Sequence, residues 1–165
     1  MDNLWAPWRM DYILDNNKAD GCIFCPQGVT GYDRERLILH VGERALVMMN
    51  RYPYNNGHLM AAPVRHVPDL TSLDSEEMAE LWQLVKLSTE CLQEIMEPDG
   101  FNIGINIGEV SGAGMASHLH VHVVPRWLGD TNFMTVLSEV RSIPEHLDQT
   151  FDRLRPLFAR AFGED

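Results

Sequence analysis

The sequence predicts an α+β domain with a mostly antiparallel sheet, one long helix on one face of that sheet and a further helix at the C-terminal end. The first observation behind this fold class is the order of elements, which is three strands, a helix, two strands and a helix. The second is that the 165 residues contain no internal repeat, low-complexity segment or break in composition. We therefore expect a single domain over residues 1–165.

Apolar segments separated by Pro and Gly clusters predict the first three strands, over residues 36–40, 45–49 and 58–63. The clearest helix follows from Ser75 to Met96, where apolar residues recur at helical spacing. Asp74 can cap its first turn, with Glu77 reaching back as in a capping box. The segment after Met96 ends the helix, because it contains Pro and Gly.

Two strands and a helix complete the prediction. The strand expected over residues 101–107 alternates apolar residues with Asn102, Gly104, Asn106 and Gly108, so it would bury the first set and present the second. Residues 118–124 form the next strand. A helix over residues 145–162, weakened or kinked at Pro156, lies in a C-terminal tail of about residues 145–165.

Three histidines, His118, His120 and His122, alternate with apolar residues in the last strand. Successive imidazoles would lie about 7 Å apart on one face of that strand. Pairing with the preceding strand as a hairpin would put Asn102 and Asn106 on the same face. A single histidine would be explained as a half-buried structural residue, whereas three in phase indicate a site of chemistry.

The segment between these two strands contains Gly112 and Gly114. A glycine-rich loop alone is weak evidence of function, because a long hairpin loop has the same composition. Beside three histidines it gains weight, since glycines allow backbone N–H groups to converge on a phosphate.

The charge balance limits the possible partners. There are 13 Lys and Arg against 24 Asp and Glu, a formal net charge of −11, so no nucleic-acid partner is expected. Small anionic ligands remain compatible, because backbone N–H groups, His and one or two Arg can hold a phosphate. No apolar run approaches the roughly 20 residues of a membrane span, and residues 1–10 lack an apolar signal core. We expect a cytoplasmic protein with no membrane association and no organic cofactor.

Cys22 and Cys25 form a C-x-x-C pair. In a reducing compartment this spacing is typical of half a metal site or of a redox pair. The absence of a βαβ pattern around the pair disfavours redox chemistry. A zinc site needs two further ligands, which spacing alone does not choose among the seven histidines. Two reduced cysteines packed as small apolar groups are the alternative.

The histidine motif, His118-Leu119-His120-Val121-His122-Val123-Val124, resembles the signature of the histidine triad (HIT) nucleotide-binding family. The resemblance extends through residues 50–53, 57–59, 63 and 125–127 and covers most of the chain. Residues 4–10 and 129–133 resemble the bacterial branch of diadenosine tetraphosphate phosphorylases or hydrolases. The resemblance implies a HIT-like fold and a homodimer whose sheets join edge to edge.

The resemblance also implies an activity, cleavage of dinucleoside polyphosphates through a covalent nucleotidyl-histidine intermediate. It assigns the nucleophile to His120 and contact with the α-phosphate to His122. Asn106 would help to fix the ribose or phosphate, and Asn50 stands where the family contacts the ribose hydroxyls. A neutral imidazole is a competent nucleophile near pH 7, because its ordinary pKa is about 6.5.

One departure from the family concerns the second acceptor. In the branch that cleaves diadenosine triphosphate, a Gln lies four residues before the first histidine, where this chain has Gly114. No side chain can hold a water molecule there. Inorganic phosphate would then accept the nucleotidyl group, as in a phosphorylase.

Zinc-carrying members of the superfamily point to His66 and His118 as the partners of Cys22 and Cys25. The resemblance thus implies a closed, structural zinc site that ties a knuckle-like segment of about residues 1–30 to the sheet.

The residues leave other functions open. The triad could hold a catalytic zinc in a metal-dependent phosphoester hydrolase, although three residues spread over about 14 Å of strand would let one ion reach only a near pair. A nucleoside phosphoramidate hydrolase would use a similar substrate class. A nucleotide-binding regulatory module is the non-enzymatic alternative, which the intact His120 disfavours.

Overall fold

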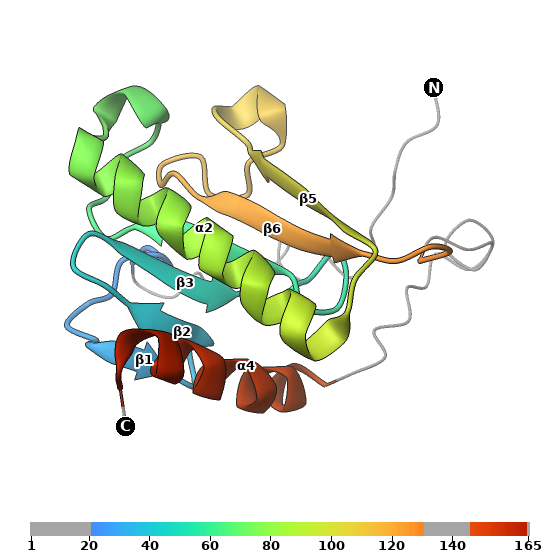
Figure 1. The fold of residues 1–165 in the computed structure, drawn as a ribbon. Helices are drawn as coiled ribbons and strands as arrows, with labels where there is room; N and C mark the ends of the chain where they lie inside the picture. Colours follow the sequence, from blue (N-terminus) through green and yellow to red (C-terminus); the bar gives the residue numbers. More distant parts are fainter. Residues whose placement is uncertain (1–20, 131–145, 165) are drawn as a thin grey trace, which may run out of the picture.

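The computed structural model describes residues 21–130 and 146–164. Within these ranges, six strands form one sheet in the order β1-β2-β3-β4-β6-β5, and every neighbouring pair is antiparallel (Figure 1). The strands are β1 (Gly31–Asp33), β2 (Ile38–Val41), β3 (Ala45–Met49), β4 (Leu59–Pro63), β5 (Gly100–Ile105) and β6 (Val121–Arg126). The α+β prediction is confirmed, and among the strands of the described ranges only the short β1 had no counterpart in it.

Helix α2 (Ser75–Met96) has the bounds that its sequence predicts. The Asp74 side chain accepts from the backbone N–H groups of Glu76 and Glu77, and the Glu77 carboxylate accepts from the Asp74 N–H, so the capping box is present. The helix stops where Glu97 adopts a left-handed conformation with φ 47°. No helix in the described ranges is long and apolar enough to cross a membrane.

Helix α4 (Leu147–Phe162) packs beside α2 on the same face of the sheet (Figure 1). It begins after His146, and the helix continues through Pro156 as one element. Its residues Phe151, Leu154 and Phe158 are fully buried with the helix-facing residues of β2, β3, β4 and β6. This arrangement leaves the histidine motif on the opposite side of the sheet.

The opposite face carries a second, smaller apolar cluster, and is therefore less open than a one-sided arrangement implies. Phe24 is 1% exposed and covers residues of β2, β3 and β4 there. The cluster consists of Phe24, Ile38, Leu46, Met48, Met60 and Ala62. Burial of an aromatic side chain contributes roughly 1.5–3 kcal/mol, so the loop that contains Phe24 is held firmly on this face.

The strand expected over residues 118–124 begins three residues later than predicted, at Val121. The reason is a non-local contact, because the Leu119 N–H donates to the carbonyl of Val67 at 2.6 Å instead of to a sheet neighbour. His118 and His120 therefore precede β6, and only His122 lies within it.

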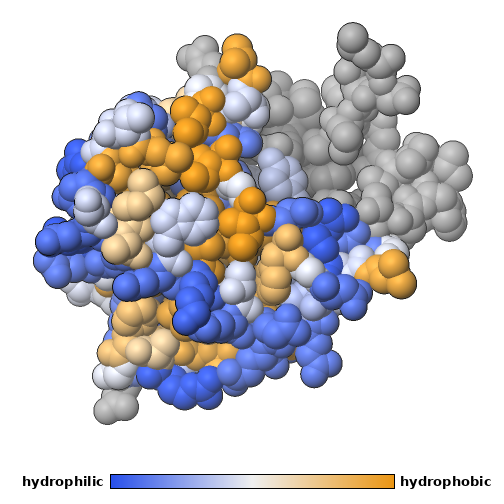
Figure 2. All heavy atoms as spheres, turned by 45° about the horizontal axis from the view of Figure 1, so that its top comes forward, coloured by the Kyte–Doolittle hydropathy of each residue, from blue (hydrophilic) through white to orange (hydrophobic). Residues whose placement is uncertain are grey.

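The prediction that the apolar residues of the strand over residues 101–107 are buried is also only partly correct. Ile103 and Ile107 are 43% and 44% exposed, because β5 is the last strand of the sheet and α2 lies over β3, β4 and β6 instead. Figure 2 turns the top of the view in Figure 1, which includes β5, toward the reader. Hydrophobic and hydrophilic surface alternate on the face that it shows.

Candidate functional site

The histidine rings of the motif, with Phe24 against both His118 and His120, form a row on the face opposite the helices. The His120 and His122 rings are 4.8 Å apart between centroids and perpendicular. Phe24 stacks on His120 at 4.5 Å and is tilted against His118 at 5.4 Å. His58 extends the row beyond His122, with a centroid distance of 5.1 Å. The His120 and His122 rings are thus closer than alternation along one strand predicts.

His120 is 4% exposed and its ring is oriented by the backbone. Its Nδ1 lies 2.9 Å from the carbonyl oxygen of His118, which can only accept, so Nδ1 carries the proton. The lone pair of the neutral ring is then on Nε2. Burial lowers the pKa of His120 below its ordinary value, which favours this neutral form. The site therefore presents an unprotonated nitrogen at neutral pH.

His58 sets the proton position on His122. The backbone N–H of Tyr54 donates to Nδ1 of His58 at 3.1 Å, and the Asn50 side-chain amide lies 3.3 Å from the same atom. Neutral His58 therefore carries its proton on Nε2, which donates to Nδ1 of His122 at 3.0 Å. His122 is left with an N–H on Nε2, a donor suited to a phosphate oxygen.

No motif in the sequence assigns chemistry to His58. Its partner in the row is 64 residues away, so no spacing rule connects the two histidines. The available signal was the position of His58 as the first residue of the third predicted strand. The observed strand, β4, begins one residue later and pairs Met60 with His122.

The remaining substrate-binding candidates lie around the row to different extents. Asn106 and His122 line one cavity of about 430 Å³ on this face. Asn50 directly follows β3, where its Oδ1 accepts from the Tyr52 N–H at 2.9 Å. Gly112 and Gly114 do not line that cavity. They lie in the loop before His118, where Gly112 has a φ of 81° that favours glycine.

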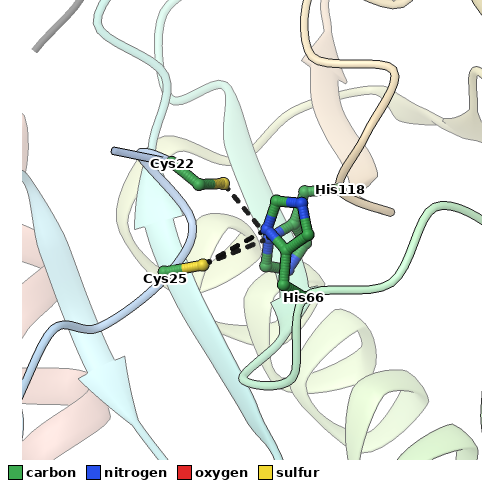
Figure 3. A group of neighbouring side chains, drawn as sticks. All are labelled: Cys22, Cys25, His66 and His118. Carbon is green, nitrogen blue, oxygen red and sulfur yellow. Dashed lines mark hydrogen bonds between the residues drawn. The ribbon is translucent and has the colours of Figure 1, made fainter. Parts of the chain in front are cut away.

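Cys22, Cys25, His66 and His118 converge on one point, although they come from three separate segments (Figure 3). Nδ1 of His118 lies 3.2 Å from Sγ of Cys22, 3.7 Å from Sγ of Cys25 and 3.2 Å from Nδ1 of His66. A tetrahedral zinc ion separates sulfur and nitrogen ligands by about 3.3–3.8 Å. Sγ of Cys25 lies 3.4 Å from Nδ1 of His66, and all four ligand atoms lie within 4.8 Å of one another, so small side-chain shifts would place them around such an ion.

The surroundings of this cluster also fit a cation. Nε2 of His118 donates to the Pro63 carbonyl at 2.8 Å, which directs the Nδ1 lone pair toward the two cysteines. Burial lowers the pKa of His118 to about 4, so the ring is neutral, as a ligand must be. Burial and the neighbouring Cys22 raise the pKa of Cys25, whereas the nearby Arg36 guanidinium lowers it.

Arg36 supports the loop that contains Cys22 and Cys25. Its guanidinium donates to the carbonyls of Ile23, Cys25 and Pro26 at 3.0, 2.7 and 2.8 Å. Three backbone acceptors are thereby satisfied by one side chain, which fixes the turn that presents both thiols. Hydrogen bonds within the protein thus position both thiols.

The arrangement does not favour one ion shared by the three histidines of the motif. His118 directs Nδ1 to the cysteines, whereas His120 uses Nδ1 to bind the His118 carbonyl.

A second cavity of about 560 Å³ lies on the helix side, and it is lined by His40 and Phe162 but by no residue of the motif. His40 stacks on Phe162 at 3.6 Å and binds Glu164, so it anchors the end of α4.

An α+β domain with a row of histidines beside β4 and β6, one of which is also part of a Cys-His cluster, defines the class of protein. The HIT domain model matches residues 34–127, and the chain belongs to that family.

Particular relatives agree with this assignment. The chain is 36% identical over 167 aligned residues to the AP-4-A phosphorylase of Mycobacterium tuberculosis, covering 97% of this chain and 86% of that protein. It is 28% identical to the bis(5'-adenosyl)-triphosphatase of Dictyostelium discoideum, covering 76% of this chain and 87% of that protein. A zinc-bound histidine triad family protein from Mycobacterium smegmatis superposes with a TM-score of 0.62 at 27% identity, covering 78% of this chain and 88% of that one.

Proposed function

We propose that this protein is an enzyme that cleaves dinucleoside polyphosphates, such as diadenosine tetraphosphate, through a nucleotidyl group carried on His120. The observation behind the proposal is the buried, neutral imidazole of His120, whose Nδ1–H is bound to the His118 carbonyl so that Nε2 is the nucleophile. The names of the mycobacterial and Dictyostelium relatives support this substrate class.

The first step of the proposed reaction forms a bond between Nε2 of His120 and the α-phosphorus. The bond from that phosphorus to its bridging oxygen breaks, and the oxygen departs with the electron pair on a nucleoside triphosphate. His122 donates its Nε2–H to the α-phosphate, because His58 holds the proton of His122 on that atom. Asn106 and Asn50 are proposed to orient the phosphate or the ribose of the bound nucleotide.

The second step returns the imidazole to its starting state. An oxygen of inorganic phosphate attacks the α-phosphorus, the nitrogen–phosphorus bond breaks and ADP leaves. Phosphate is the proposed acceptor because Gly114 offers no side chain to hold a water molecule. The backbone N–H groups of Gly112 and Gly114 are proposed to contact the phosphates, although neither glycine lines the cavity beside His122.

Product analysis tests the proposal. Diadenosine tetraphosphate should give ADP and ATP only when inorganic phosphate is present, and the His120→Ala protein should give neither. His146→Ala, which changes an exposed histidine at the start of α4, is the matched control. Formation of AMP and ATP without phosphate would replace phosphorolysis with hydrolysis, and undiminished turnover by His120→Ala would overturn the mechanism.

A separate test addresses Gly114 directly. Gly114→Gln should raise hydrolysis relative to phosphorolysis, because its amide can bind a water molecule near the histidines. An unchanged ratio of AMP to ADP among the products would remove the argument from Gly114.

We further propose that the Cys-His cluster holds structural zinc. Cys22, Cys25, His66 and His118 supply the usual two sulfur and two nitrogen ligands, with no position left open for a substrate. Bound zinc would tie the loop containing Phe24 to the sheet. Metal analysis should find about one zinc per chain, and chelation should lower the melting temperature. Substoichiometric zinc with an unchanged melting temperature would remove this part of the proposal.

Assembly and location complete the proposal. We propose a homodimer joined along β5, because Ile103 and Ile107 are exposed at this edge of the sheet. Sedimentation should show a dimer that Ile103→Lys weakens. A cytoplasmic location is proposed because thiols placed to ligate a metal need a reducing compartment.

A further inference from the structure

The cavity beside His122 extends away from the nucleophile along β5 and β6. The strand register pairs Gly104 with His122 and Asn102 with Val124, so these residues share the face of the sheet that carries the histidines. The lining consists of Tyr54, Asn55, Asn102, Ile103, Gly104, Asn106, His122, Val124 and Arg126. Among the described residues that line it, the polar groups are mainly amides and one guanidinium, and none is a carboxylate.

Arg126 lies at the end of this cavity that is remote from His122. Its guanidinium binds Asp130 through Nε at 2.5 Å and Nη2 at 2.7 Å, and Nη1 donates to Oδ1 of Asn102 at 2.7 Å. Asp130 is in turn held by the Asn55 side-chain amide at 2.8 Å. The positive group is therefore ordered before any ligand arrives, while its side chain remains 40% exposed.

The order of residues along β6 relates this cation to the proposed reaction. A strand rises about 3.3 Å per residue, so Arg126, four residues after His122, lies roughly 13 Å beyond it, and His120 lies on the other side of His122. In phosphoryl transfer, the leaving oxygen departs roughly opposite to the attacking atom. A group expelled by attack from His120 is thus directed past His122 and into the cavity.

We propose that this cavity is the binding subsite of the leaving nucleotide, and that Arg126 recognises the phosphates of its polyphosphate chain. The inference rests on the proposed function, because it takes His120 as the nucleophile. Asn102 positions the guanidinium through Oδ1. A phosphate that reaches Arg126 competes with the Asp130 carboxylate for the cation, so Asp130 limits how tightly the leaving nucleotide is held and favours its release.

Two substrates with the same adenylyl group separate this subsite from the rest of the site. Diadenosine tetraphosphate has a polyphosphate leaving group, whereas the 4-nitrophenyl ester of AMP has a leaving group without phosphate. Arg126→Gln should lower kcat/KM for the first about tenfold to a hundredfold and leave the second within about twofold. Arg126→Lys should restore part of the loss. Arg160→Gln, which removes an exposed cation of α4 paired with Glu94, should change neither rate.

Asp130→Asn distinguishes phosphate recognition from a purely structural role of the ion pair. Removal of the competing carboxylate should keep or lower KM for diadenosine tetraphosphate. If Arg126 only braces the chain, Arg126→Gln and Asp130→Asn should impair both substrates equally, which would overturn the subsite. Unchanged rates for both substrates in Arg126→Gln would overturn it as well. Absence of turnover of either substrate by the unaltered protein would instead reject the proposed function, and the subsite with it.

Discussion

Replacement of His58 by Phe tests whether the fourth histidine of the row controls the reaction. The substitution keeps a ring of similar size at a position that is 1% exposed, but removes the donor that lies 3.0 Å from Nδ1 of His122. Without that donor, His122 can carry its proton on Nδ1 and lose the hydrogen bond from Nε2 to the substrate phosphate. A hydrogen bond to a charged group contributes about 1.5–3 kcal/mol.

This free energy corresponds to a fall of roughly 10- to 150-fold in kcat/KM. Initial rates with diadenosine tetraphosphate, followed by separation of the nucleotide products, measure the fall. His58→Gln should recover part of the activity, because its amide can still donate toward His122. The covalent nucleotidyl enzyme should still form on His120 in both variants, only more slowly.

Stability has to be measured alongside the rate. The Tyr54 N–H loses its acceptor in His58→Phe, which costs about 1–3 kcal/mol of folding free energy. His40→Phe is the matched control. His40 is also a buried histidine, but unlike His58 it lies on the helix side of the sheet, away from the histidine row. A folded His58→Phe protein with kcat/KM within threefold of the original would refute the proposed control of His122.

Three further predictions concern stability, pH and the metal cluster. Paired with Arg65 and the Asp74 N–H, Glu77 has a pKa lowered to about 2, so its stabilisation is complete above about pH 4.5 and is lost as the pH falls toward 2. Glu77→Gln should therefore destabilise the protein by about 1–2 kcal/mol at pH 7, after allowance for the exposed guanidinium, and urea unfolding should show the difference shrinking at acid pH. Because burial lowers the pKa of His120, kcat/KM should fall less than about threefold between pH 7 and pH 6, and a steeper decline in a pH–rate profile would contradict this. Cys25→Ser should lower both zinc content and melting temperature, whereas Cys91→Ser, within α2, should leave zinc content unchanged.

Local chemistry explains which parts of the fold were predictable. Asp74 and Glu77 fix the start of α2 through contacts within one turn, so the helix could be read from its own residues. Alternation likewise placed Asn102 and Asn106 beside His122. The start of β6 depends instead on the Val67 carbonyl, which is remote in sequence from Leu119 and cannot be recognised from any repeat.

The candidate site likewise has some contacts that the sequence predicts and others that depend on the folded chain. The motif itself pointed to His120 and His122, and their rings do meet in the structure. The stacking of Phe24 on His120 and the contact of His58 with His122 required the assembled sheet, because each joins segments that no spacing rule relates. The exposure of Ile103 followed from its place on an edge strand, which the alternation of β5 does not reveal.

The connectivity of the sheet also has a consequence for folding kinetics. β2, β3 and β4 are consecutive in the chain and pair as neighbours, so they can associate by closing short loops. The pairing of β4 with β6 must wait for the intervening α2 and β5, and the contact of Cys22 with His118 spans 96 residues. Contacts of such long range form slowly. On dilution from denaturant, helical circular dichroism should recover before turnover, since the histidine row is complete only when the most distant segments have met.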